Sequence, residues 1–159
     1  MSLFVEIQNP EAFTSVPADE LIEQWARAAC LEENEASVVI RIVGIEEGLD
    51  LNQSYRHKDY PTNVLSFPYE PSDFELEFLS AEELGHLGDL VLCLPVIERE
   101  AAEQAKPLSH HWAHLIVHGL LHLQGFDHED SEIEADIMEA REIEILRQLG
   151  IPNPYESNE

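Results

Sequence analysis

Basic residues are scarce in this chain of 159 residues, which has eight lysines and arginines against 33 aspartates and glutamates. The formal net charge of -25 excludes broad electrostatic capture of a polyanion, since any nucleic acid would meet net repulsion. Salt screens distant charges, so a local basic spot can still act on a nearby phosphate. The tightest basic cluster contains Arg56 and Lys58, which are therefore the candidate substrate contacts.

Cysteines and long apolar runs are scarce too. Cys30 and Cys93 form neither a close-spaced ligand pair nor a disulfide framework, so we expect buried free thiols in a reducing compartment. No apolar run approaches the roughly 18 residues of a membrane span, and the first residues lack the basic stretch of a signal peptide. These absences predict a cytoplasmic protein with no membrane partner.

Hydrophobic periodicity predicts a single α+β domain over residues 1–159, with one core. The expected strands are 3–7, 37–43, 63–67 and 88–94, and the expected helices are 17–31, 46–56, 95–106, 108–123 and 131–149. This order is typical of a small mixed four-stranded sheet packed with helices. Residues 69–86 are acidic and irregular, and we expect a mobile loop there.

Two more detailed expectations concern single elements. The strand at 37–43 is β-branched and nearly all apolar, which predicts burial on both faces of the sheet. The last helix is expected to begin with a capping box between Ser131 and Glu134 and to carry the apolar residues Ile133, Ile137, Met138, Ile145 and Leu149.

Three histidines between residues 118 and 128 stand at a spacing that suits zinc. His118 and His122 are four residues apart, so both imidazoles point the same way on a helix. Gly125 can take the positive φ that ends a helix, and the chain can then turn so that His128 supplies a third nitrogen. Three imidazoles leave one position of a tetrahedral zinc open, which is typical of a catalytic site. The pattern predicts one Zn²⁺ per chain, held by His118, His122 and His128.

The residue after His118 bears on the chemistry. Zinc peptidases carry a glutamate there, in the motif H-E-x-x-H, as the general base, whereas this chain has Gly119. Gly119 also lies on the apolar stripe of its helix, where it permits close packing. The motif therefore indicates a hydrolytic metal site that lacks the peptide-cleaving base.

Several nearby residues have roles that the residues alone leave open. His114 either lines the site, where it could act in catalysis as a proton relay, or simply packs. Asp127 either orients an imidazole N–H or is a plain turn carboxylate. Arg56 offers a planar fork of donors to a phosphate, although a surface ion pair is the commoner role of an arginine. His110 and His111 are expected on the helix surface.

Five segments, in matching order from about Val38 to the C-terminus, together resemble one known family. They are LN–YR at 51–56, KDYPTNVLSFP at 58–68, LGDLVLC at 87–93, HGLLHLQGFDH at 118–128 and Pro154-Tyr155. In this combination the chain resembles the bacterial YbeY endoribonucleases. The acidic stretch at 69–86 is not covered by the likeness.

The resemblance implies a metal-dependent, single-strand-specific endoribonuclease of ribosomal RNA. It implies maturation of the 3′ end of the small-subunit RNA and a part in ribosome quality control. It also implies that His118, His122 and His128 hold the zinc, with His118 a catalytic candidate through the metal, and that Arg56 binds phosphate. The implied partners are the small ribosomal subunit, a small-subunit ribosomal protein and an assembly GTPase, which would deliver RNA to this acidic chain.

Two alternatives from other functional classes remain open. A ribosome-assembly factor with a chiefly structural zinc could use its acidic surface to dock on basic ribosomal proteins. A zinc peptidase or amidase would use the same three ligands but needs a base that Gly119 cannot provide. For the nuclease, the sequence leaves open whether water or the RNA's own 2′-hydroxyl attacks the phosphorus.

Overall fold

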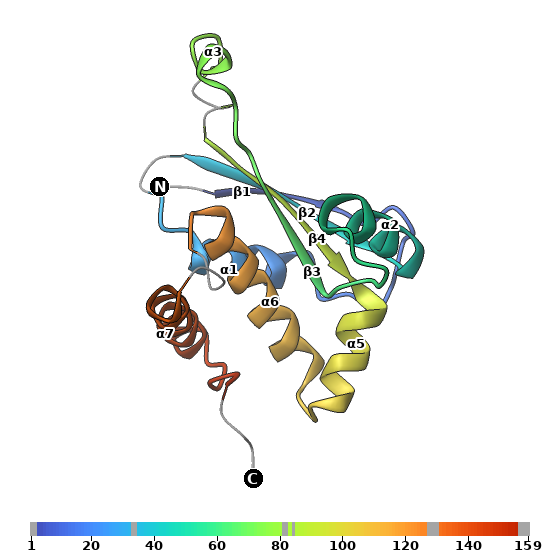
Figure 1. Cartoon of the computed structure of the whole chain (residues 1–159). Helices are drawn as coiled ribbons and strands as arrows, with labels where there is room; N and C mark the ends of the chain where they lie inside the picture. Colours follow the sequence, from blue (N-terminus) through green and yellow to red (C-terminus); the bar gives the residue numbers. More distant parts are fainter. Residues whose placement is uncertain (1–2, 33–34, 81–82, 84, 127–130, 156–159) are drawn as a thin grey trace.

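The structure, a computed structural model, describes residues 3–32, 35–80, 83, 85–126 and 131–155. One mixed sheet runs through it, with strand order β1-β2-β4-β3 (Figure 1). Its strands are β1 (Leu3–Gln8), β2 (Ala36–Val43), β3 (Val64–Pro68) and β4 (His86–Cys93). β1, β2 and β4 run parallel, and β3 pairs antiparallel with β4. The predicted α+β class with a small mixed four-stranded sheet is confirmed.

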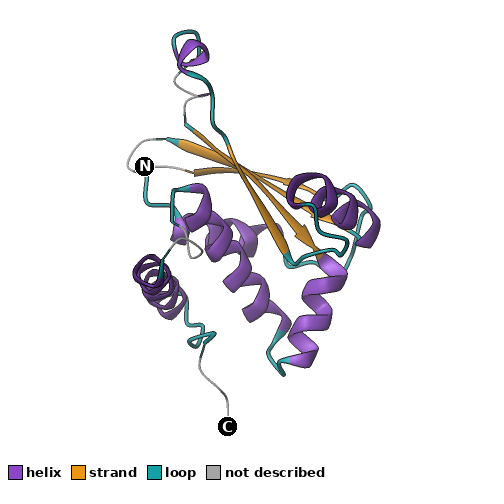
Figure 2. Cartoon of the chain, in the orientation of Figure 1, coloured by secondary structure: helices purple, strands orange, loops and turns teal. Residues whose placement is uncertain are grey.

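Six helices accompany the sheet in the part of the chain that the structure describes (Figure 2). They are α1 (Asp19–Ala29), α2 (Ile45–Arg56), α3 (Asp73–Leu76), α5 (Leu94–Glu103), α6 (Leu108–Leu123) and α7 (Glu132–Gln148). Helix α6 is central, because it contacts β3, β4, α1, α5 and α7. No helix in the described ranges is both long and apolar enough to cross a membrane.

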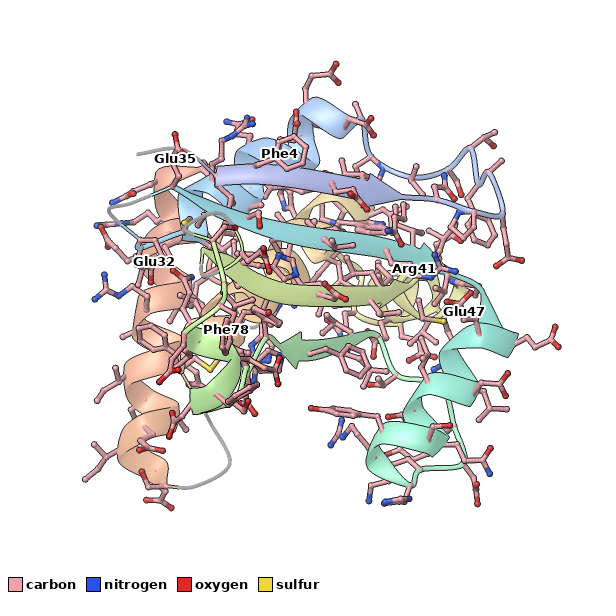
Figure 3. All side chains as sticks on the ribbon, turned by 90° about the horizontal axis from the view of Figure 1, so that it is seen from above. Phe4, Glu32, Glu35, Arg41, Glu47 and Phe78 are labelled. Carbon is pink, nitrogen blue, oxygen red and sulfur yellow. The ribbon has the colours of Figure 1, made fainter. Side chains whose placement is uncertain are left out.

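The sheet has one closed face and one more open face. Val38, Ile40 and Ile42 of β2 are buried on the side that α1 and α6 cover. Of the alternate β2 residues, Val43 is buried but Ser37, Val39 and Arg41 are only half-buried, so the prediction of burial on both faces is wrong. One of them, Arg41, extends toward Glu47 of α2 with Nε 2.6 Å from a carboxylate oxygen (Figure 3). Because β2 carries the charged Arg41 on this face, helices do not need to cover the whole length of the strand on this side.

The apolar residues of α7 are not all buried. Met138, Ile145 and Leu146 are buried, whereas Ile133 and Ile137 are 73% and 54% exposed. Ile137 lies about 100° around the helix from Met138 and falls on the exposed side of α7. Glu142 lies one turn after Met138 on the same side of the helix and is fully buried.

Residues 69–86 are not irregular throughout. They contain helix α3, which stands away from the sheet in Figure 1 and begins with a capping box between Ser72 and Glu75. Mobility of this stretch stays a prediction. Cys30 and Cys93 are both buried and free, as expected.

Candidate metal centre

A cleft of about 670 Å³ brings the main candidate residues together. Arg56, His118 and His122 all line it, although they come from α2 and α6. The other lining residues that matter below are Tyr55, His114, Phe126 and Tyr155. Residues of α2, β3 and α6 line this cleft and come together only in the folded chain, so no local sequence pattern could place Arg56 beside the histidines.

Helix α6 presents a row of histidines to the cleft and apolar residues to the core. His114, His118 and His122 recur once per turn and line the cleft. The ring centroids of His118 and His122 are 4.7 Å apart, and those of His114 and His118 are 6.1 Å apart. Trp112 and Ile116, on other faces of the same helix, are fully buried. Core packing therefore sets the direction in which the histidines point.

The chain beyond α6 turns as expected. Gly125 has φ 101°, a conformation that glycine adopts at little cost. His128 and Asp127 lie outside the described residues. The third zinc ligand and the role of Asp127 therefore stay predictions.

Behind the histidines lies a buried carboxylate, Glu142 of α7, whose side chain is 0% exposed. It accepts hydrogen bonds from Nδ1 of His118, from Nε2 of His114 at 3.3 Å and from the hydroxyl of Tyr155. Burial alone would raise the pKa of Glu142, but these hydrogen bonds outweigh it and lower the pKa from 4.5 to about 2. Glu142 is therefore an anion at neutral pH that orients the imidazole of His118.

Tyr155 reaches this carboxylate from the C-terminal segment. Its ring meets His114 edge-on, with centroids 5.4 Å apart and an interplanar angle of 82°. Burial, followed by the hydrogen bond and charge of Glu142, raises the pKa of Tyr155, so its hydroxyl keeps the proton that it donates. The segment is anchored by Lys106, whose Nζ donates to the carbonyl of Pro154 at 2.9 Å.

The donor chemistry of the cleft fits a zinc ion. His114, His118 and Glu142 each place one ligand atom within 4.8 Å of the other two, and imidazole nitrogen and carboxylate oxygen both bind zinc. A ligating histidine commonly donates its other ring N–H to a carboxylate. His118 has this arrangement with Glu142, which makes Nε2 the nitrogen that would bind metal.

Two ligand sets are therefore compatible with the described residues, and they share His118. One uses His118 and His122 with Glu142 as the hydrogen-bond partner behind them, and the other uses His114, His118 and Glu142 directly. The first set suits the hydrogen bonds better, because Glu142 already accepts three of them.

The two basic candidates have different positions. Arg56 occupies the last turn of α2 and lines the cleft. Lys58 follows the left-handed residue His57, which ends α2, and is not among the described residues that line the cleft. The substrate-binding roles of both residues stay predictions.

Gly119 packs against β4, which bears on the peptidase alternative. A Cβ added at this position would lie 2.7 Å from Cδ2 of Leu90, closer than real Cβ contacts come. Gly119 itself is buried in the helix–sheet interface. A glutamate here would place a carboxylate in the apolar core, so this fold leaves no place for the base of the H-E-x-x-H motif.

Sequence reasoning missed Glu142 and misplaced His111. The available signal for Glu142 was its position one turn after Met138, where the helix pattern calls for an apolar side chain. His111 is 4% exposed rather than on the helix surface, and its Nε2 lies 2.9 Å from Glu100 of α5. The prediction failed there because the turn between α5 and α6 folds α5 over this part of α6. His110 is half-buried.

Comparison with known proteins gives consistent matches along the chain. A sequence model described as endoribonuclease YbeY matches residues 5–150. The endoribonuclease YbeY of Methylococcus capsulatus is 54% identical over 157 residues, which cover 95% of each chain. That of Burkholderia ambifaria is 52% identical over 140 residues, covering 88% of this chain and 74% of the relative.

A solved structure supports the fold independently of these names. The solution structure of TM1509 from Thermotoga maritima is similar with a TM-score of 0.56, covering 96% of this chain and 99% of that one. The two sequences are 22% identical, so this likeness concerns the fold alone. Because the family match spans most of the chain and the two relatives align over 95% and 74% of their lengths, this chain belongs to the endoribonuclease YbeY family.

Proposed function

We propose that this chain is a metal-dependent endoribonuclease that processes ribosomal RNA. The observation that carries the proposal is one cleft lined by Arg56, His118 and His122. A guanidinium suits a phosphate, and a histidine pair one helical turn apart suits a divalent metal. The relatives, which are named endoribonuclease YbeY, support the same function.

In the proposed site, His118, His122 and His128 hold one zinc ion. Bound zinc would polarise a phosphoryl oxygen and lower the pKa of water. Glu142 fixes the ring orientation and tautomer of His118 through the Nδ1 hydrogen bond. Arg56 binds a nonbridging oxygen of the phosphodiester and holds it in the cleft.

The primary test is the metal content of the purified protein, together with cleavage of single-stranded RNA with and without chelator. We expect about one zinc per chain and cleavage that chelation abolishes and zinc restores. Peptide hydrolysis without RNA cleavage would favour the peptidase alternative instead.

The role of Arg56 is tested by Arg56→Ala, with Arg99→Ala as the matched control. Arg99 lies on α5 with a side chain 61% exposed and is not among the described residues of the cleft. We expect about tenfold or greater loss of cleavage in Arg56→Ala, from the lost charge-assisted bond to phosphate, and none in the control. Undiminished cleavage in Arg56→Ala would show that Arg56 is not the phosphate ligand.

The two ligand sets predict different zinc binding when the neighbours of His118 are substituted. If His122 is a ligand, His122→Ala loses bound zinc whereas His114→Ala retains it. The reverse result would assign the metal to His114, His118 and Glu142.

The attacking group is identified from the ends of the RNA products. A 2′,3′-cyclic phosphate indicates attack by the RNA's own 2′-hydroxyl, whereas its absence under conditions where a cyclic phosphate survives indicates attack by water. Both routes use the roles of Arg56 and the histidines proposed above.

In the cell, the proposed task is maturation of the 3′ end of the small-subunit RNA and ribosome quality control, in the cytoplasm. A small-subunit ribosomal protein and an assembly GTPase would bring the RNA to this acidic chain. A His118→Ala strain should then accumulate unprocessed RNA as a deletion strain does. If folded His118→Ala protein rescued fully, the assembly-factor alternative would replace the enzyme.

A further inference from the structure

The walls of the cleft carry more aromatic than cationic side chains. Arg56 is the one lysine or arginine among the described residues that line it, whereas Tyr55, Phe126 and Tyr155 contribute rings. With a formal net charge of -25, the chain gains little RNA affinity from long-range attraction. Binding a strand of RNA here requires a source of affinity other than phosphate contacts.

Tyr55 presents an aromatic surface directly beside Arg56. It lies in the last turn of α2 and is 52% exposed. Its ring packs against Phe67 of β3, with centroids 4.4 Å apart and an interplanar angle of 53°. The contact with Phe67 restricts the ring while half of the residue stays accessible. A restrained, accessible ring of this kind is a surface on which a nucleic-acid base can stack.

Tyr155 presents a second aromatic surface from a different part of the chain. It is 46% exposed, and its ring is held by the hydroxyl bond to Glu142 and the edge contact with His114. The C-terminal segment that carries it and the helix α2 that carries Tyr55 lie on different sides of α6 (Figure 1). The cleft thus has a restrained tyrosine on each of two walls.

We propose that Tyr55 and Tyr155 are stacking positions for unpaired RNA bases on either side of the phosphate bound by Arg56. This inference rests on the proposed function and names the residues that select a single strand. Bases in a duplex are already paired and stacked, so only an unpaired strand can turn base faces onto these rings. Because every base has a π-face, the two positions tolerate many sequences.

Tyr55 is tested with a pair of substitutions and a matched control. Tyr55→Leu keeps apolar contact with Phe67 but removes the aromatic face, whereas Tyr55→Phe keeps it. Tyr60→Leu is the control, because Tyr60 is 55% exposed and is not among the described residues that line the cleft. All variants are compared as zinc-loaded full-length protein.

Binding is measured with a single-stranded phosphorothioate oligoribonucleotide that contains 2-aminopurine, whose fluorescence reports stacking. We expect Tyr55→Leu to weaken binding about fivefold or more and to reduce the fluorescence change, and Tyr55→Phe and Tyr60→Leu to match the wild type. In cleavage, the loss should appear in KM rather than kcat. Equal affinity and fluorescence in Tyr55→Leu and Tyr60→Leu would overturn the stacking role of Tyr55.

Tyr155 needs a variant that separates stacking from its bond to Glu142. Tyr155→Phe removes the hydroxyl and keeps the ring, so it should retain oligonucleotide affinity. Tyr155→Leu removes both and should lose affinity about fivefold or more. If both variants lose affinity equally, Tyr155 acts through Glu142 and is not a stacking position.

Salt dependence tests the premise that phosphate contacts are few. With about one phosphate contact, affinity should fall only about threefold between 50 and 200 mM salt, whereas three or more contacts would give more than tenfold. The steeper fall would overturn the premise that RNA binding here needs a source of affinity other than phosphate contacts.

Failure of this inference and failure of the proposed function give different results. If wild-type protein cleaves RNA while Tyr55→Leu and Tyr155→Leu cleave with unchanged KM, the inference alone is wrong. If the zinc-loaded wild type neither binds nor cleaves single-stranded RNA, the proposed function is wrong and the inference falls with it.

Discussion

Two histidines of helix α6, His111 and His118, bind carboxylates of different neighbouring helices, and the burial of the two pairs is opposite. His111 is 4% exposed and contacts Glu100 of α5, whose side chain is 26% exposed. His118 is 21% exposed and donates to Glu142 of α7, whose side chain is 0% exposed. In one pair the imidazole is buried, and in the other the carboxylate is.

This difference separates a structural pair from a candidate functional one. Burial lowers the pKa of His111, although the hydrogen bond and charge of Glu100 partly oppose the shift. Nδ1 of His111 is buried without a hydrogen-bond partner in the described structure, and His111 is not among the described residues that line the cleft. The buried anion of Glu142 instead orients His118 from behind, and the ring of His118 lines the cleft.

The largest expected effect is the difference in zinc binding and RNA cleavage between His118→Ala and His111→Ala. His118→Ala should lose bound zinc and reduce RNA cleavage about a hundredfold or more, because a ligand of the catalytic metal is removed. His111→Ala should keep both its zinc and its cleavage rate. Metal analysis and cleavage kinetics measure both quantities, and a zinc-free His111→Ala protein would contradict the distinction.

The next largest effect is the difference in zinc affinity between Glu142→Gln and Glu100→Gln. Glu142→Gln should weaken zinc binding about tenfold to a hundredfold, because a neutral amide orients His118 less well and makes it a poorer ligand. Glu100→Gln is the matched control and should bind zinc like the wild type. Competition with a chromophoric chelator measures the affinity, and equal values for the two variants would remove Glu142 from the metal site.

A smaller effect concerns folding at the structural pair. His111→Ala should lower the free energy of unfolding by about 2 kcal/mol, since it leaves a cavity and removes a hydrogen bond to Glu100. His110→Ala, at a half-buried position on the same helix, should cost less. Urea unfolding at one saturating zinc concentration measures both, and equal losses would mean that the His111 pair adds no special stability.

The smallest effect is the pH dependence of that stability. The folded-state pKa of His111 lies below 6.5. As the pH falls past 6.5, the unfolded chain therefore binds more protons than the folded chain does. The contribution of His111 should be complete above pH 6.5 and decline below it, towards the lowered pKa. Glu100, His114 and Lys106 surround the ring and are present in both proteins. The stability gap between wild type and His111→Ala should therefore narrow in acid, and a constant gap would contradict the shift.

Much of the fold could be predicted from the sequence, because periodicity is local. The four strands and the long helices are close to their predicted ranges, and Gly125 has the expected positive φ. The errors came where a neighbouring element decides burial, as on the second face of β2 and at His111. Helix α7 packs through the face of Met138 and Glu142, and α5 covers His111, which no local pattern specifies.

By itself, the sequence determined the spacing of the histidines, the glycine in place of a peptidase base and the family. Those features depend on residue identity and on the pitch of a helix. Only the tertiary structure decided that Arg56 shares a cleft with His118, and that Glu142 lies buried behind it. These groups come from α2, α6 and α7, so their meeting depends on how the helices pack against one another and the sheet rather than on any neighbour in the chain.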